Sequence, residues 1–260
     1  MMSKLRPWGL ALVAALLTST LSGLTTARAE EATVLELRVY TCEADKLDAL
    51  NTRFRDHTLR IFEKHGMKNV AYWVPTDGET AKTTLIYIIE HKSRDAAKAS
   101  WDAFRADPEW KKVAADSAEA HGKILAKAPD ATYMVPTDYS AKIGPVSQEK
   151  VYELRTYTAA EGKLDALHAR FRDHTDKIFQ RHGMKTIGYW VPQDEPGSKN
   201  LLIYVVEHAS REAAAESWKA FGADPEWKKA RAESEADGSL LAKRPESVFM
   251  KATDYSPKAK

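Results

Sequence analysis

His57 and His174 are the two histidines whose positions best suit acid–base chemistry. Around the first of them, Leu50, Phe54 and Ile61 recur at helical spacing, and position 57 fills the vacant place on that apolar stripe. A residue on such a stripe faces the interior of the fold, and an imidazole sheltered there can act as acid, base or ligand. We therefore predict that both histidines face a sheet and are candidate catalytic residues. The alternative is a pair of buried histidines held by backbone or carboxylate partners.

Charged and aromatic side chains alternate with apolar ones along two predicted strands, near residues 34–41 and 151–158. If the apolar side packs under helices, the polar side lines the interface between two sheets. The arginines suit an anionic ligand, because a guanidinium fork grips a carboxylate. The alternative is structural ion pairing with neighbouring glutamates. The candidate ligand-binding residues are Arg38, Tyr40, Arg155 and Tyr157, and the glutamates are Glu36 and Glu153.

Four further aromatic residues are candidate ligand contacts: Trp73, His91, Trp190 and His208. Each tryptophan has the alternative role of a core residue, since large aromatics dominate small cores. The histidines show no H-E-x-x-H or facial-triad spacing, so we predict no metal site. We also predict no cofactor, because the chain has no Gly-rich phosphate loop, nucleophile elbow or C-x-x-C-H haem attachment motif.

The elements that position these residues occur twice. Residues 34–113 and 151–230 align at an offset of 117, with 49 of 80 positions identical. A period above 100 residues is too long for a solenoid repeat, so we predict two whole domains in tandem. They span residues 33–140 and 150–256, joined by a linker over 141–149 that holds Gly144 and Pro145.

Each repeat predicts the order strand, helix, strand, strand, helix with an appended helix, strand. In the first repeat the strands cover 34–41, 69–74, 84–91 and 132–135. A helix over 46–65 ends at Gly66, a second begins after Ser93, and a third begins at Asp107 and Pro108. This is an α+β, ferredoxin-like unit with helices on one sheet face. We expect the two bare faces to pack together as an intramolecular pseudo-dimer.

Residues 1–29 have the features of a secretory signal peptide. A basic start is followed by an apolar run over 10–17 and by Ala27-Arg28-Ala29, which predicts cleavage after Ala29. The apolar run is about half the length of a spanning helix, so we expect no stable membrane span after cleavage and a periplasmic or secreted protein. Without Lys4, Arg6 and Arg28, 36 basic residues face 37 acidic ones, a balance that disfavours nucleic-acid binding.

Several motifs shared by both repeats carry a family resemblance: E-L-R-x-Y-T, H-G-M, Y-W-V-P and the Ser-Arg and Trp positions of the second helix. With this order of elements the chain resembles the NIPSNAP family of the dimeric α/β-barrel superfamily. The resemblance implies a barrel and a ligand, where one exists, between helices and sheet. It leaves three hypotheses: small-molecule binding, a cofactor-independent monooxygenase or isomerase using the two histidines, and a structural or protein-interaction module. Fold alone does not choose among them. Further homo-oligomerisation also remains open.

Overall fold

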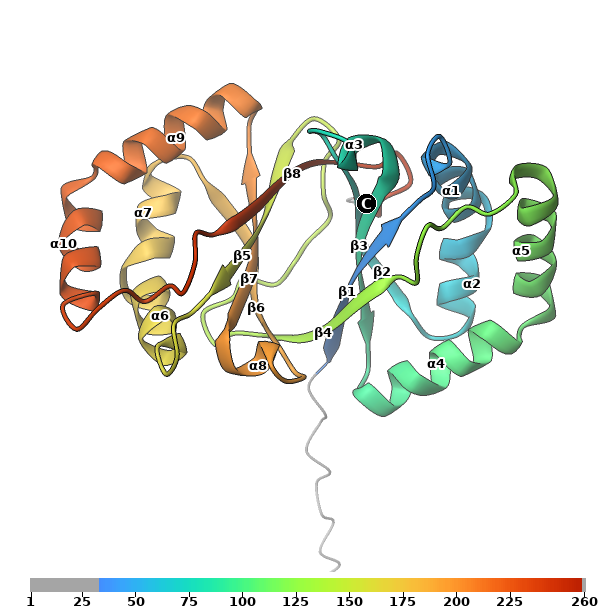
Figure 1. Cartoon of the computed structure of the whole chain (residues 1–260), viewed down its shortest axis with the longest axis horizontal. Helices are drawn as coiled ribbons and strands as arrows, with labels where there is room; N and C mark the ends of the chain where they lie inside the picture. The colour runs from blue at the N-terminus through green and yellow to red at the C-terminus, as the bar shows by residue number, and fades with distance from the viewer. Residues whose placement is uncertain (1–32, 259–260) are drawn as a thin grey trace, which may run out of the picture. The chain divides into compact units, whose positions relative to one another are not determined.

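The computed structural model describes residues 33–258, which form two similar halves (Figure 1). The elements of the first half are β1 (Val34–Thr41), α1 (Leu47–Arg53), a π-helical turn (Phe54–Thr58), α2 (Leu59–Lys64), β2 (Lys68–Pro75), α3 (Thr80–Thr83), β3 (Thr84–His91), α4 (Arg94–Ala106), α5 (Pro108–His121) and β4 (Asp130–Pro136). Those of the second half are β5 (Val151–Thr158), α6 (Leu164–Arg170), a π-helical turn (Phe171–Thr175), α7 (Asp176–Arg181), β6 (Lys185–Pro192), α8 (Gly197–Asn200), β7 (Leu201–His208), α9 (Arg211–Ala223), α10 (Pro225–Ser234) and β8 (Glu246–Ala252).

The strands close into one antiparallel barrel in the order β1-β3-β2-β8-β5-β7-β6-β4. Closure depends on the last strand of each half, because β4 pairs with both β1 and β6, and β8 pairs with both β5 and β2. The helices of the two halves flank the barrel on opposite sides (Figure 1). The predicted α+β pseudo-dimer is therefore confirmed, and closure pairs both edges of the sheet of one half with the other half.

The barrel interior is apolar, which corrects the expected direction of the strand faces. Leu35 and Leu37 of β1 point inward and pack with side chains from both halves, including Val146 from the predicted linker. Glu36 instead bonds to Trp101 of α4, so the polar side of β1 lies under the helices. The physical reason is that helix side chains can satisfy a buried carboxylate, whereas the dry interior of a small barrel cannot.

A π-helical turn displaces His57 from the position expected for it. The turn at Phe54–Thr58 adds a residue to the helix between α1 and α2 and shifts the following side chains by one place. Thr58 is buried in the position expected for His57, while His57 is exposed. The same turn in the second half buries Thr175 and leaves His174 half-exposed. The prediction that these histidines face the sheet was wrong.

Other local predictions are confirmed. Ser93 caps α4 by accepting a hydrogen bond from the backbone N–H of Ala96 at 3.1 Å, and Asp107 caps α5, in which Pro108 is the first residue. Gly66 ends α2 with a φ of 78°, a conformation that glycine adopts without strain.

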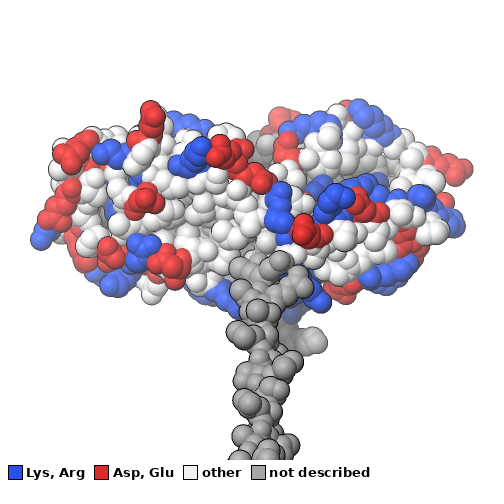
Figure 2. Space-filling view, turned by 90° about the horizontal axis from the view of Figure 1, so that it is seen from below, with Lys and Arg blue, Asp and Glu red and all other residues white. Residues whose placement is uncertain are grey.

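The predicted signal peptide lies outside the described residues. Within residues 33–258, no helix is long and apolar enough to cross a membrane. Figure 2 shows acidic and basic side chains interspersed on one face of the molecule, without a large patch of one sign.

Candidate functional site

A buried carboxylate, that of Glu36 on β1, lies at the centre of a polar network beneath α4. Arg38 Nη1 donates to Glu36 Oε1 at 2.5 Å, and the indole N–H of Trp101 donates to Oε2 at 2.8 Å. His91 Nε2 lies 2.8 Å from the same Oε2. These partners come from β1, β3 and α4, so the network joins the sheet to the helix that covers it.

The second half repeats this network around Glu153. Its partners are Arg155 at 2.5 Å, Trp218 at 2.7 Å and His208 at 3.1 Å, with an added hydrogen bond of 2.6 Å from Ser247 Oγ. The predicted pairing of each glutamate with the arginine two residues later is thus present in both halves.

Both glutamates are ionised at neutral pH despite their burial. Burial alone raises the pKa of Glu36, but hydrogen bonds from His91 and Trp101 and the charge of Arg38 outweigh it and lower the pKa. For Glu153 the same balance, with His208 as the largest favourable contribution, lowers the pKa to about 2. Each network therefore holds a carboxylate paired with a guanidinium.

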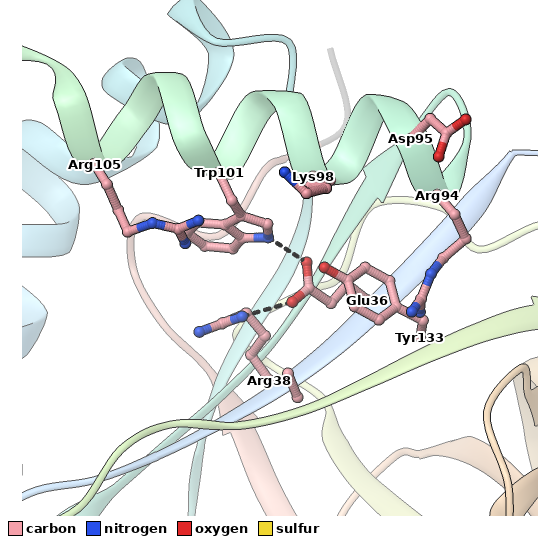
Figure 3. A pocket seen from close by; sticks show the side chains of 9 residues that line it. Glu36, Arg38, Arg94, Asp95, Lys98, Trp101, Arg105 and Tyr133 are labelled. Atoms are coloured by element: carbon pink, nitrogen blue, oxygen red, sulfur yellow. Dashed lines mark hydrogen bonds and ion pairs between the residues drawn. The ribbon is translucent and has the colours of Figure 1, made fainter.

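An open cleft of about 440 Å³ lies beside the Glu36 network, between α4 and the strands β1 and β4 (Figure 3). Its lining residues are Glu36, Arg38, Arg94, Asp95, Lys98, Trp101, Arg105, Ala131 and Tyr133. Four of these side chains are cationic and two are acidic. The cleft is large enough for a small organic molecule.

Two of the guanidinium groups are held against aromatic rings. Arg38 lies 4.3 Å from the centroid of the Trp101 ring, and Arg94 lies 3.6 Å from that of Tyr133. Such stacking is favourable for the cation and limits its freedom. The edges of both groups can then donate hydrogen bonds to a ligand in the cleft, whereas the stacked ring faces are already covered.

The structure separates the sequence-predicted residues into distinct places. Trp73 and Trp190 lie in the barrel interior, away from the cleft. Tyr40 and Tyr157 pack in the helix–sheet cores of the first and second halves. Of the predicted ligand contacts, Arg38 alone lines the cleft in the first half.

The remaining predicted residues lie either in the two glutamate networks or closer to the surface. His91 and His208 lie buried in the two glutamate networks, with Arg155 equivalent to Arg38 in the second. His57 and His174 line neither the cleft nor these networks.

Sequence reasoning missed the part of the cleft contributed by α4 and β4. Arg94, Lys98, Trp101 and Arg105 follow one another at intervals of four, three and four residues, which places them on one helix face. A search for cations at helical spacing around a tryptophan finds this stripe. Tyr133 gives no comparable signal, because its place opposite Glu36 depends on the pairing of β1 with β4. Among the described residues, no group of three or more His, Cys, Asp or Glu side chains is placed to hold a metal ion.

Comparison with solved structures shows the same fold in two distant relatives. A provisionally assigned monooxygenase from Fusobacterium nucleatum superposes with a TM-score of 0.55 at 11% identity, over 85% of this chain and 93% of that one. Another from Lactobacillus acidophilus has a TM-score of 0.50 at 14% identity, over 85% and 94%. A NIPSNAP family protein of unknown function from Agrobacterium tumefaciens matches at 26% identity with a TM-score of 0.37, over 45% and 100%.

Comparison with curated proteins finds no match. The NIPSNAP family, by contrast, matches twice, over residues 35–141 and again over residues 152–257. These two segments cover most of the chain and correspond to the two halves of the barrel. The chain therefore belongs to the NIPSNAP family and carries two NIPSNAP domains in tandem.

Proposed function

We propose that this protein binds a small molecule in the cleft between α4 and the sheet of its first half. The observation that carries the proposal is a cleft of about 440 Å³ built on a buried carboxylate that is bonded to an arginine, a histidine and a tryptophan. Arg38 joins the two, since it bonds to Glu36 and also lines the cleft. A buried ionic network fixes the positions of its members, so the floor of the cleft is preorganised for a ligand.

The enzyme hypothesis has less support. It assigned acid–base chemistry to His57 and His174, and neither side chain lines the cleft. Two structural relatives are provisionally named as monooxygenases, but at 11% and 14% identity the likeness concerns the fold. A purely structural role leaves unexplained why cations gather around an open cleft.

A fragment screen followed by NMR or calorimetry tests small-molecule binding. In the variant Ala131→Trp, a large side chain replaces a small one in the cleft wall, and we expect binding of any fragment hit to weaken at least tenfold. The control is Ala120→Trp, the same change at an exposed site on α5. Hits that bind both variants equally, or a screen without hits, would refute binding in this cleft.

We also propose that residues 1–29 direct export and are removed after Ala29. The proposal is supported by the basic start, the apolar run and the A-x-A end of this segment. The intact mass of protein recovered from the periplasmic fraction of a bacterial host tests it. We expect the mass of a chain that begins at Glu30. Recovery of the uncleaved chain in the cytoplasm would contradict the proposal.

A further inference from the structure

We infer that the cleft of the first half takes a small organic molecule with two or more oxyanion groups, and that the equivalent place in the second half does not. The inference rests on the proposed function and names its ligand class and stoichiometry. It is carried by the cations of the cleft and by the replacement of two of them, Lys98 and Arg105, in the second repeat.

The cations of the cleft differ in exposure in a way that suits capture of an anion. The Arg38 side chain is 13% exposed and anchored by Glu36, whereas those of Arg94, Lys98 and Arg105 are 41%, 80% and 62% exposed. The buried arginine supplies a fixed donor at the floor, and the other three can move toward a ligand. Nε of Arg38 is buried and has no hydrogen-bond partner within residues 33–258.

The exposed cations are held by partners that a ligand can replace. Lys98 and Arg105 share Asp102, at 2.8 and 2.6 Å, and Arg94 pairs with Asp194 of the second half at 3.1 Å. Exposed ion pairs of this kind contribute about 0–1 kcal/mol. Carboxylate or phosphate oxygens in a partly enclosed cleft bind guanidinium groups more strongly than that, because the bonds are charge-assisted and less hydrated.

The spacing of the cations favours more than one anionic group. Lys98 and Arg105 are seven residues apart on α4, which corresponds to about 10 Å along the helix axis. Arg94 lies one further turn away, and Arg38 faces the helix from β1. A single compact anion reaches a subset of these groups, whereas a ligand with separated oxyanion groups can engage the floor and the helix together.

The second repeat keeps the network and two of the four cations, as Arg155 and Arg211, but lacks the other two. Ala215 and Gly222 stand where α4 has Lys98 and Arg105, and Lys219 stands where it has Asp102. The strand opposite differs as well: Ser247 replaces Ala131 and Phe249 replaces Tyr133, as the equivalent strand pairings show. Ser247 Oγ bonds to Glu153, so a chain hydroxyl occupies an acceptor site of that carboxylate. On α9, Lys219 therefore stands alone where α4 has two cations, Lys98 and Arg105, seven residues apart.

Calorimetric titration with succinate, and with its neutral diamide succinamide, tests the inference on the full mature chain. We expect one succinate per chain and no detectable binding of the diamide. The variant K98A/D102K/R105A gives α4 a charge pattern like that of α9 without changing its net charge, and we expect succinate affinity to fall about tenfold or more. The reciprocal variant A215K/K219D/G222R should add a second site. Ethane-1,2-bisphosphonate, which also carries two anionic groups on a two-carbon spacer, distinguishes phosphorus oxyanions from carboxylates.

The outcomes separate the inference from the proposed function. Two succinates per wild-type chain, equal binding of the diamide, or unchanged affinity in the first variant would overturn the ligand class or the asymmetry. If neither succinate nor ethane-1,2-bisphosphonate binds, the inference fails. The fragment screen with Ala131→Trp then decides independently whether the cleft binds small molecules at all. Circular dichroism of each variant confirms that it remains folded.

Discussion

The two buried glutamates stabilise each half only while they are ionised. Each accepts hydrogen bonds from an arginine, a histidine and a tryptophan, which together outweigh the cost of burying the charge. Removing the charge leaves a guanidinium without its partner beneath the helix. The networks therefore link local stability to pH as well as forming the floor of the cleft.

Acid should destabilise the protein through Glu153. Its pKa in the folded state is lowered from 4.5 to about 2, so its contribution is complete above the unfolded-state pKa and is lost as the pH falls from about 4.5 toward 2. A shift of this size corresponds to about 3 kcal/mol. Glu153→Gln should lower stability at pH 7 and flatten the pH dependence below pH 4.5, as measured by urea unfolding.

The exposed residue Glu246 provides the control for this experiment. It pairs with Lys243 at the surface, where ion pairs contribute little, so Glu246→Gln should leave both the stability at pH 7 and its acid dependence nearly unchanged. Parallel curves for wild type and Glu153→Gln below pH 4.5 would show that Glu153 does not have a lowered pKa.

At the scale of the elements, the π-helical turn determines which side chains of the first helix face the sheet. Thr58 is 1% exposed, and its hydroxyl donates to the carbonyl oxygen of Arg53 at 3.1 Å. The added residue in the turn puts the threonine inward and the histidine outward. A stripe of apolar residues at regular spacing carries no sign of this shift.

Substitutions at His57 and Thr58 should therefore differ in their effect on stability. His57→Ala should change the free energy of unfolding by less than about 0.5 kcal/mol, because the side chain is exposed. Thr58→Val keeps the shape but removes a buried hydrogen bond, and should cost about 1 kcal/mol. Thermal or urea unfolding of the two variants measures the difference. A larger loss for His57→Ala would show that the imidazole has a buried partner.

Two short segments exchange between the halves and act as reciprocal clasps. Residues 137–140 follow β4 of the first half but bind the second, where Asp138 forms a two-bond pair with Arg172 at 2.7 Å. Residues 253–256 follow β8 and bind the first half, where Asp254 pairs with Arg55 at 2.9 Å. Each segment ends in a serine that accepts a backbone hydrogen bond from the other half: Ser140 from β6 and Ser256 from β2.

The two clasp serines form a matched pair for mutation. Ser256 is 3% exposed and bonds to the N–H of Tyr72, which is fully buried. Ser256→Ala should cost about 1–3 kcal/mol because the donor is left unsatisfied. Ser140→Ala should cost less, since Ser140 is only half-buried and water can replace its hydroxyl. Equal costs would argue against burial as the cause.

At the scale of the whole molecule, the halves share one core rather than packing as separate domains. Strands β4 and β8 each pair with both halves, and the apolar interior contains side chains from all eight strands and from the linker residue Val146. Neither half can lose its structure without opening the barrel and exposing this interior to water.

Unfolding should therefore occur in a single transition. Although the sequence divides into two homologous domains, we expect coincident urea curves from tryptophan fluorescence and from far-UV circular dichroism, and one peak in calorimetry. Two separated transitions would show that each half keeps a core of its own. Variants confined to one half, such as Thr58→Val, should shift the whole curve rather than part of it.

The sequence alone determined the repeat, the order of the elements, the caps at Ser93 and Asp107, and the family, because these depend on local patterns and on similarity between segments. It also identified the glutamate–arginine pairs, which are only two residues apart on a strand.

The tertiary structure decided which face of each strand lies inward, the phase of the helix after the π-helical turn, the exchange of the clasps and the position of Tyr133 opposite Glu36. Alternation along β1 shows two faces but does not say which is covered by helices. That choice depends on partners such as Trp101, 65 residues away from Glu36 in sequence, which come close only when α4 packs on the sheet.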